Sequence, residues 1–328
     1  MKKTIAIFVS LTLFTLSSRG QVAEEPFKMT AKPTITIHSN FATGLNNSSN
    51  ISGFNLERTY LGTTFVLSET LSGRVRFDVG STNLAGSDLE MVAYVKNAEI
   101  KWKEDNFTLN AGMISTIQFA AQEKFWGYRY LLKSFQDEYK FGSSADLGVS
   151  AAYKFSDMLT IDATVINGEG YKKVNKDDAF RYGGGFHFTP IEPLLIRAYY
   201  DRYDVASGAV EIAQENVSLF VGLSQEPFSI GAEYNILYNA SKVSGNDLYG
   251  YSVYSTVQLP KDFEVYMRWD YMYSRNDYHI AKDGQLGVLG LQYSVSKYVQ
   301  LSPNFRLWQP ASGGEATLTA LVNLHLNF

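Results

Sequence analysis

The amino-acid sequence predicts an all-β protein, namely an antiparallel up-and-down transmembrane β-barrel of about 16 strands with short periplasmic turns and long extracellular loops. Three observations carry this prediction. Polar and apolar residues alternate along many segments, the spacers between these segments alternate between short and long, and aromatic residues gather where the segments end.

The alternation is clearest at 74–79, 160–165, 263–271 and 317–328. Successive side chains of a β-strand point to opposite faces of the sheet, so each of these segments has one apolar face and one mainly polar face. A soluble β-sandwich would show the same alternation, with its apolar side chains facing inward. The choice between the two folds therefore depends on the lengths of the segments and spacers.

Those lengths favour the membrane barrel. The segments have about 9 to 12 residues, which suits a tilted membrane strand better than the usual strand of five or six. Short spacers lie at 69–72, 103–106, 156–158, 190–193, 225–227, 260–262 and 296–298, and longer ones at 42–52, 80–88, 116–144, 167–178, 204–216, 239–247, 275–284 and 310–315. Two aromatic girdles are predicted, one of Trp102, Phe107, Phe155, Phe188, Phe228, Phe263 and Phe328 near the short turns, and one of Tyr200, Tyr238, Tyr249, Tyr271 and Tyr273 near the long loops.

The barrel must be closed, because an open sheet edge in lipid would leave backbone groups unpaired at several kcal/mol each. The strand segments begin near Thr34 and end at Phe328, and an even count places both ends on the periplasmic side. A count of 18 rather than 16 stays open. The last segment, 321–328, resembles the terminal targeting strand that the barrel-insertion machinery recognises, so Phe328 is the expected assembly signal.

The N-terminus predicts export. Lys2 and Lys3 precede an apolar run from Ile5 to Leu16, and small residues stand before Gln21. This is the layout of a cleavable secretory signal, whereas a membrane anchor would need about 20 apolar residues. We expect residues 1–20 to be the signal peptide and residues 21–328 to form one outer-membrane barrel domain.

Composition excludes several classes of function. The formal net charge is −4 and becomes −7 when the three basic residues of the signal are removed, which argues against a nucleic-acid partner. The chain has no cysteine and four histidines, which lie on different segments, so no catalytic, cofactor-binding or metal-binding residues are predicted. The segment before the first strand is too short for the plug of an active transporter.

The polar faces of the predicted strands would line a lumen. Charged residues are costly in a packed core but tolerable in a water-filled pore, where they bias the passage of ions. Many of them could instead pair across neighbouring strands and stabilise the wall. The predicted lumen residues are Arg58, Arg74, Arg76, Asp78, Glu99, Lys101, Lys154, Asp162, Arg181, Arg197, Asp201, Glu233, Glu264, Arg268, Asp270 and Arg306.

Three segments carry a resemblance to a known family. They are 54–62 (FNLERTYLG), 123–130 (EKFWGYRY) and 166–170 (INGEG). With the alternation over most of the chain, they resemble bacterial porins, and in particular the phosphate-selective porin O and P-like group. The resemblance implies a water-filled channel for passive diffusion of small polar solutes or ions. The mixed sign of the predicted lumen leaves open whether the pore prefers anions or cations and whether phosphate passes.

The longest spacer, 116–144, is the third outer loop and is rich in aromatic and charged residues. The resemblance implies that it folds into the barrel and forms the constriction, with Lys124, Trp126, Arg129 and Lys133 as the constriction residues. The basic ones among them would then face acidic wall groups such as Glu99 or Asp162. A loop that lies over the barrel mouth, or that contacts another subunit, is the alternative.

The sequence therefore predicts an integral outer-membrane porin rather than an enzyme. Its expected partners are outer-membrane lipid, the insertion machinery and small polar or ionic solutes, with a homotrimer as one open form of assembly. A structural or adhesive barrel without an open pore, and a substrate-specific channel, remain the alternative functions.

Overall fold

The computed structural model describes residues 28–46, 52–81, 91–173, 175 and 177–328. The predicted signal peptide at 1–20 lies outside the described residues, as do parts of the long spacers predicted at 42–52, 80–88 and 167–178.

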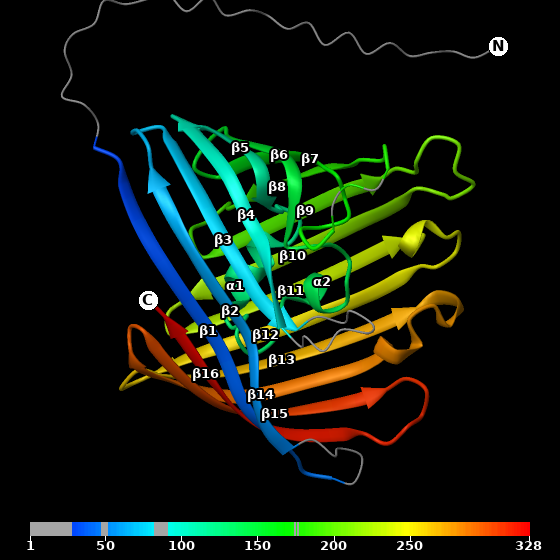
Figure 1. The fold of residues 1–328 in the computed structure, drawn as a ribbon. Helices are drawn as coiled ribbons and strands as arrows, with labels where there is room; N and C mark the ends of the chain where they lie inside the picture. Colours follow the sequence, from blue (N-terminus) through cyan, green and yellow to red (C-terminus); the bar gives the residue numbers. More distant parts are fainter. Residues whose placement is uncertain (1–27, 47–51, 82–90, 174, 176) are drawn as a thin grey trace, which may run out of the picture.

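The described residues form a closed antiparallel barrel in which each strand pairs with its neighbours in the sequence and β1 pairs with β16 (Figure 1). This confirms the predicted fold class and the count of 16 strands. The strands are β1 (Thr30–Gly44), β2 (Ser52–Val66), β3 (Leu71–Ser81), β4 (Met91–Glu104), β5 (Phe107–Ser115), β6 (Ala145–Lys154), β7 (Leu159–Ile166), β8 (Arg181–Phe188), β9 (Leu194–Tyr203), β10 (Gln214–Gln225), β11 (Phe228–Tyr238), β12 (Leu248–Leu259), β13 (Phe263–Ser274), β14 (Gly284–Ser296), β15 (Val299–Pro310) and β16 (Thr317–Asn327).

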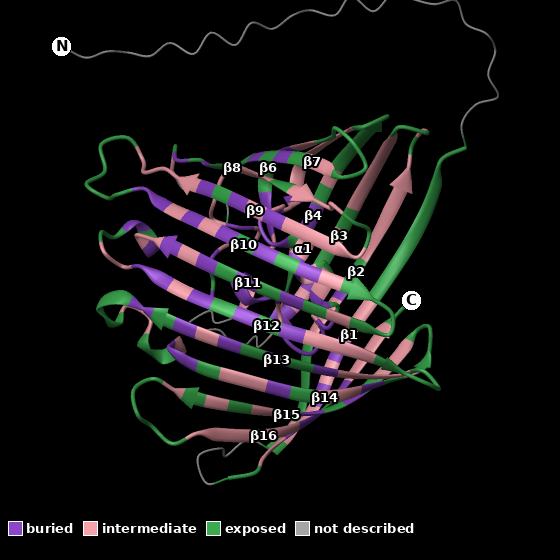
Figure 2. Cartoon of the chain, turned by 180° about the vertical axis from the view of Figure 1, so that it is seen from behind, coloured by how far each residue is buried: buried purple, intermediate pink, exposed green. Residues whose placement is uncertain are grey.

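Period-two burial follows the sequence pattern along the strands, as Figure 2 shows for β10 to β13. On β13, for example, Arg268 and Asp270 are buried, whereas Met267 and Trp269 are exposed. The apolar side chains thus point away from the barrel axis, where they can face lipid, and the charged ones point inward. This arrangement is the reverse of a soluble sandwich, in which the apolar face forms the core.

Short and long connections alternate around the barrel, as the spacers predict. The longest described connection, between β5 and β6, contains the helices α1 (Ala120–Trp126) and α2 (Phe135–Glu138). Three short 3-10 helices, η1 (Ala240–Lys242), η2 (Arg275–Asp277) and η3 (Ile280–Lys282), lie in other long connections. Within the described part of the chain, no helix has the length and apolar character needed to cross a membrane.

The C-terminal residue takes part in barrel closure. The backbone N–H of Phe328 donates to the carbonyl of Ile35 at 2.9 Å, and the N–H of Ile35 donates to the carbonyl of Phe328 at 3.1 Å. The ring of Phe328 also stacks on Tyr298, with 6.0 Å between the ring centroids. The predicted assembly signal therefore lies at the seam between the first and last strands, at the short-turn end of the barrel.

Candidate functional site

The third loop (residues 116–144) folds into the barrel and packs against one side of the inner wall. Trp126, Phe135 and Phe141 are almost completely buried. The Tyr128 hydroxyl donates to Glu264 on β13 at 2.6 Å, and the Tyr130 hydroxyl donates to Gln292 on β14 at 2.7 Å. The loop therefore occupies the part of the lumen next to β9–β15.

Three wall arginines hold the backbone of this loop. Arg197 on β9 donates to the carbonyl of Ile117 at 2.8 Å, Arg268 on β13 to that of Lys133 at 2.6 Å, and Arg306 on β15 to that of Leu131 at 2.8 Å. Hydrogen bonds from a charged donor are stronger than neutral ones. These three contacts connect the beginning and the middle of the loop to the wall.

The wall charges beneath the loop are buried and paired. Arg197 contacts Asp162 at 2.7 Å, Arg268 contacts Asp270 at 2.8 Å, and Arg181 lies 3.5 Å from Asp201. All six side chains are less than a tenth exposed, and two of them, Arg197 and Arg268, also donate to the loop backbone. His187 also contacts Asp162, at 3.1 Å.

Inward-facing glycines make room for the loop's aromatic side chains. Gly222 on β10 and Gly231 on β11 are cross-strand partners, and a Cβ atom on Gly222 would lie 2.4 Å from the ring of Phe125. A Cβ atom on Gly250 of β12 would lie 2.2 Å from the ring of Phe135. Because Cβ atoms do not approach other atoms so closely, these recesses exist only where the wall has glycine.

Between the third loop and the opposite wall lie three adjoining cavities, which we call the outer, middle and inner cavities. Their volumes are about 570, 320 and 500 Å³. Arg58 and Lys133 line both the outer and middle cavities, and Tyr60 and Arg129 line both the middle and inner ones. The cavities therefore adjoin one another in this order, and β2 contributes Arg58 or Tyr60 to each of them.

Basic residues dominate the linings of these cavities, although the whole chain has a net charge of −4. The basic lining residues are Arg58, Arg74, Arg76, Lys96, Lys124, Arg129, Lys133, Lys140, Lys172, Lys173, Arg181 and Arg306. The acidic ones are Glu57, Glu123, Asp137, Glu138 and Glu169. Charges in a narrow cavity act more strongly than charges in open water, so this excess gives the cavities a positive potential.

Tyr60 lies at the centre of the basic groups. The Lys96 ammonium and the Arg76 guanidinium lie over its ring at 4.8 and 5.1 Å from the centroid. Its hydroxyl accepts hydrogen bonds from Arg58 at 3.2 Å and from Lys96 at 3.3 Å. A tyrosine ring attracts cations through its negative face, which holds these like charges close together.

Two β-bulges turn toward the lumen charged residues that strict alternation would assign to the outer surface. In the pairing of β1 with β2, His38 faces Arg58 and the next residue pair skips Glu57. In the pairing of β3 with β4, the register skips Lys96 in the same way. A bulge adds one residue to a strand and can redirect a side chain. Glu57 and Lys96 consequently line the cavities, and the sequence analysis missed both of them.

The basic residues of the third loop do not face the acidic wall groups that we expected. Arg129 pairs with Glu123 and, at 2.7 Å, with Asp137, both from the loop itself, and Lys133 lies 4.0 Å from Glu138. Glu99 pairs instead with Arg74, and Asp162 with Arg197. The expectation was wrong because these wall acids already have basic partners on the wall itself, Glu99 on the adjacent strand and Asp162 two strands away.

The loop's own ion pairs keep their charges. Burial alone would raise the pKa of Asp137, but the guanidinium of Arg129 outweighs this effect and holds the pKa below its ordinary value. Asp137 therefore stays ionised and neutralises part of the charge of Arg129.

Three further predicted residues are placed as follows. Asp78 is buried, lies 3.3 Å from Arg58 and accepts a hydrogen bond from Tyr171. Lys101 lies near the short-turn end of β4 and is exposed. Trp126 is buried among Tyr128, Tyr254 and Tyr266, so it anchors the loop rather than facing the cavities.

The histidines do not form a metal site with the acidic residues. Among the described residues, no group of three or more His, Cys, Asp or Glu side chains could hold a metal ion. His38 and His325 lie side by side across the seam between β1 and β16, with 5.0 Å between their ring centroids, and Tyr130 of the loop stacks on His325.

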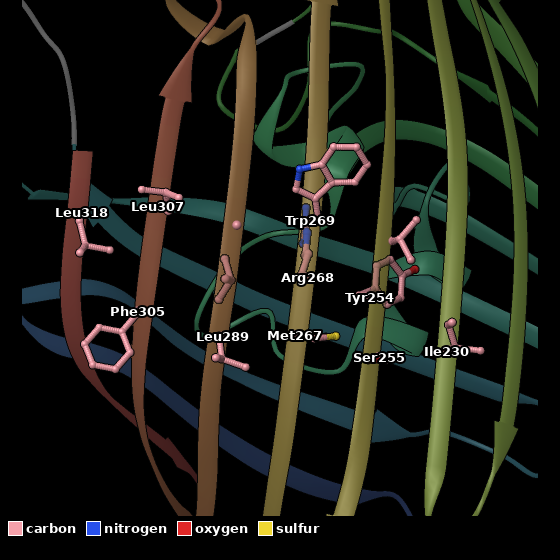
Figure 3. Close-up of a pocket in the computed structure, with 13 residues that line it drawn as sticks. Ile230, Tyr254, Ser255, Met267, Arg268, Trp269, Leu289, Phe305, Leu307 and Leu318 are labelled. Atoms are coloured by element: carbon pink, nitrogen blue, oxygen red, sulfur yellow. The ribbon is translucent and has the colours of Figure 1, made fainter. Parts of the chain in front are cut away.

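A separate groove of about 570 Å³ lies on the outer surface, across β11–β16 (Figure 3). Most of the side chains that face it, such as Met267, Trp269, Leu289 and Phe305, are apolar and exposed and point away from the lumen, whereas the neighbouring Tyr254 and Arg268 are buried. A large apolar surface of this kind suits contact with lipid acyl chains and does not form part of the path through the barrel.

This outer surface predicts how a charge would affect stability. Replacing Leu289, in the middle of β14, with arginine should lower the free energy of unfolding by about 2–4 kcal/mol, because a charge near the bilayer midplane must be taken out of water. The matched change Gln309→Arg, at the long-loop end of β15, should cost about 0–1 kcal/mol. Urea unfolding in lipid vesicles measures both, and equal effects would contradict the assignment of this surface to lipid.

No protein-family model matches the sequence, and no curated protein matches it. Solved structures do match the fold. The Pseudomonas putida OprB structure aligns with a TM-score of 0.69 at 8% identity, over 91% of this chain and 94% of that one. An anion-selective porin from Comamonas acidovorans aligns with a TM-score of 0.67 at 11% identity, over 92% of this chain and 100% of that one. The outer-membrane channel DcaP of Acinetobacter baumannii aligns with a TM-score of 0.65 at 11% identity, over 92% of this chain and 97% of that one.

These similarities define the fold as that of the bacterial outer-membrane porins. Together with the apolar outer surface, they identify the chain as an integral outer-membrane β-barrel.

Proposed function

We propose that the protein forms a water-filled channel across the outer membrane, through which small polar solutes or ions diffuse passively, and that the third loop narrows this channel. The observation that carries the proposal is the series of three adjoining cavities beside the third loop. The loop fills the opposite side of the lumen, so solutes would pass beside its exposed face. Hydroxyl and charged groups along this face can replace part of a solute's hydration shell.

Single-channel recording tests this function. The purified protein, inserted in a planar lipid bilayer in potassium chloride, should produce discrete and reproducible steps of current. Folded protein that inserts into the bilayer without producing any step would refute the channel and favour a structural or adhesive barrel. Far-UV circular dichroism of the same sample would establish that the barrel is folded.

The charge of the cavities supports a preference for anions. Twelve basic and five acidic residues line them. Two of the segments that resemble the phosphate-selective porin O and P-like group contribute here, because Arg58 and Tyr60 come from one and Arg129 from the other. The likeness therefore supports an anion channel, and phosphate is one candidate solute.

An enzymatic function has less support. The His187–Asp162 contact resembles part of a catalytic pair, but Arg197 donates to Asp162 at 2.7 Å and lies beside His187 beneath the loop. Within the described residues, no hydroxyl group hydrogen-bonds to His187. We infer that this pair supports the wall. Recognition of Phe328 by the insertion machinery and assembly as a homotrimer remain proposals.

A further inference from the structure

The inner cavity has a large excess of positive charge. Its charged lining residues are Arg74, Arg76, Lys96, Lys124 and Arg129 on the basic side and Glu123 on the acidic side. Glu123 is already paired with Arg129. Arg74 pairs with Glu99, which stands next to the cavity on the wall. The excess therefore falls mainly on Arg76, Lys96 and Lys124.

Arg76 and Lys96 are the groups whose charge is least compensated. Among the described residues, no carboxylate lies within salt-bridge distance of either one. Arg76 donates to the side chain of Asn97 at 2.9 Å, and Lys96 donates to the Tyr60 hydroxyl at 3.3 Å. Lys96 is only 3% exposed, yet it lines the cavity. A buried cation without an anionic partner is unfavourable, and an anion that enters the cavity would relieve this cost.

The size and lining of the inner cavity favour an organic anion over a single inorganic ion. Its volume of about 500 Å³ is many times the roughly 30 Å³ that one water molecule occupies in the liquid. Ser115, Thr116 and Ser144 add hydroxyl groups, and Phe119 adds an apolar surface. This combination can contact both the charged groups and the carbon frame of a solute.

We propose that the inner cavity is a binding site for a small organic polycarboxylate, which pauses there between Arg76 and Lys96 on the wall and Lys124 on the loop. At least two carboxylates are needed to match the excess charge, and charge-assisted hydrogen bonds from arginine and lysine are the interactions that bind them. This inference rests on the proposed channel function and names the class of solute that the same path selects.

The probe is citrate, added to single channels that carry a chloride current. Citrate should reduce the current in a saturable, concentration-dependent way, inorganic phosphate at equal ionic strength should do so more weakly, and glucose should have no effect beyond its viscosity. The double substitution Arg76→Gln and Lys96→Gln should weaken the block by citrate about tenfold or more, since both charged donors are lost. Lys96→Arg, which keeps the charge, should retain most of the block.

The control removes two positive charges outside the cavity, by Lys103→Gln and Lys261→Gln, and should leave the block unchanged. The binding site is refuted if citrate does not block, or if the double variant is blocked like the parent. If phosphate and citrate block the current equally, the cavity does not prefer an organic polycarboxylate and that part of the proposal is rejected. A protein that carries no current at all would refute the channel itself, whereas a conducting channel that ignores citrate would refute only this inference.

Discussion

Removing the inward part of the third loop should raise the single-channel conductance severalfold. The loop fills the lumen beside β9–β15 through Trp126, Phe135 and their neighbours, so its loss would widen the path for ions. Its two ends are already close, since the N–H of Thr116 donates to the carbonyl of Ser144 at 3.3 Å. Residues 118–142 can therefore be replaced by a short glycine linker without opening the gap between β5 and β6. The measurement is single-channel recording in planar bilayers.

The control for this deletion shortens a different loop. Residues 205–211, between β9 and β10, include the fully exposed Val210 and line none of the three cavities. Their removal should leave the conductance unchanged. If deleting 118–142 has no more effect than this control, the third loop does not limit the current and the pore is narrowed elsewhere.

A milder variant tests the same packing without a deletion. Gly222→Leu would place a side chain where the ring of Phe125 now lies, because a Cβ atom at position 222 would be only 2.4 Å from that ring. The loop should then be displaced from the wall while its length and charge stay the same. An altered conductance in this variant would tie the effect to the docking of the loop.

Reversing the charge of Arg74 and Arg76 should abolish the preference for anions and move it toward cations. The inner cavity has five basic residues and one acidic residue, and Arg74→Glu with Arg76→Glu leaves three of each. In a narrow passage of low effective dielectric constant, permeating ions respond strongly to a reversal of the lining charge. The reversal potential in a potassium chloride gradient measures it, and the ratio of chloride to potassium permeability should fall severalfold.

A control with two charge reversals outside the cavities distinguishes a local effect on ion selectivity from an effect of the overall net charge. Lys261→Glu and Lys297→Glu change the net charge by the same amount, but both residues lie in short turns at the barrel end. They should shift the reversal potential slightly at low salt and not at about 1 M salt, where charges are screened beyond about 3 Å. An unchanged preference in the Arg74 and Arg76 variant would mean that the inner cavity does not control selectivity.

Most of the fold could be predicted from the sequence, because the signals for it are local. The alternation at 263–271 reports which side chains share a face, and it does so without knowledge of any other strand. The loop at 116–144 was found with its bounds, since β5 ends at Ser115 and β6 begins at Ala145. The closure of the barrel could be predicted because an open sheet edge would leave backbone groups unpaired in lipid.

The site was predicted less completely, and the bulges explain part of the difference. Lys96 and Asn97 are consecutive polar residues on β4, which breaks the alternation, and this break is the signal that could have identified Lys96. Glu57 next to Arg58 on β2 gives the same signal. Strict alternation assumes that each residue of a strand faces one residue of its neighbour. A bulge inserts an extra residue, and from that point the predicted face of the sheet is reversed for each side chain until the register is restored.

The sequence by itself determined that this chain is a closed β-barrel of about sixteen strands with an apolar outside, a charged inside and a long, aromatic third loop. Only the tertiary structure decided which inward charges face open cavities. Arg268 and Arg76 look alike in the sequence, yet Arg268 is buried against Asp270 and the loop backbone, whereas Arg76 lines the inner cavity. The physical reason is that the loop contacts residues more than one hundred positions away, so its docking depends on shape and pairing across the lumen that no local pattern records.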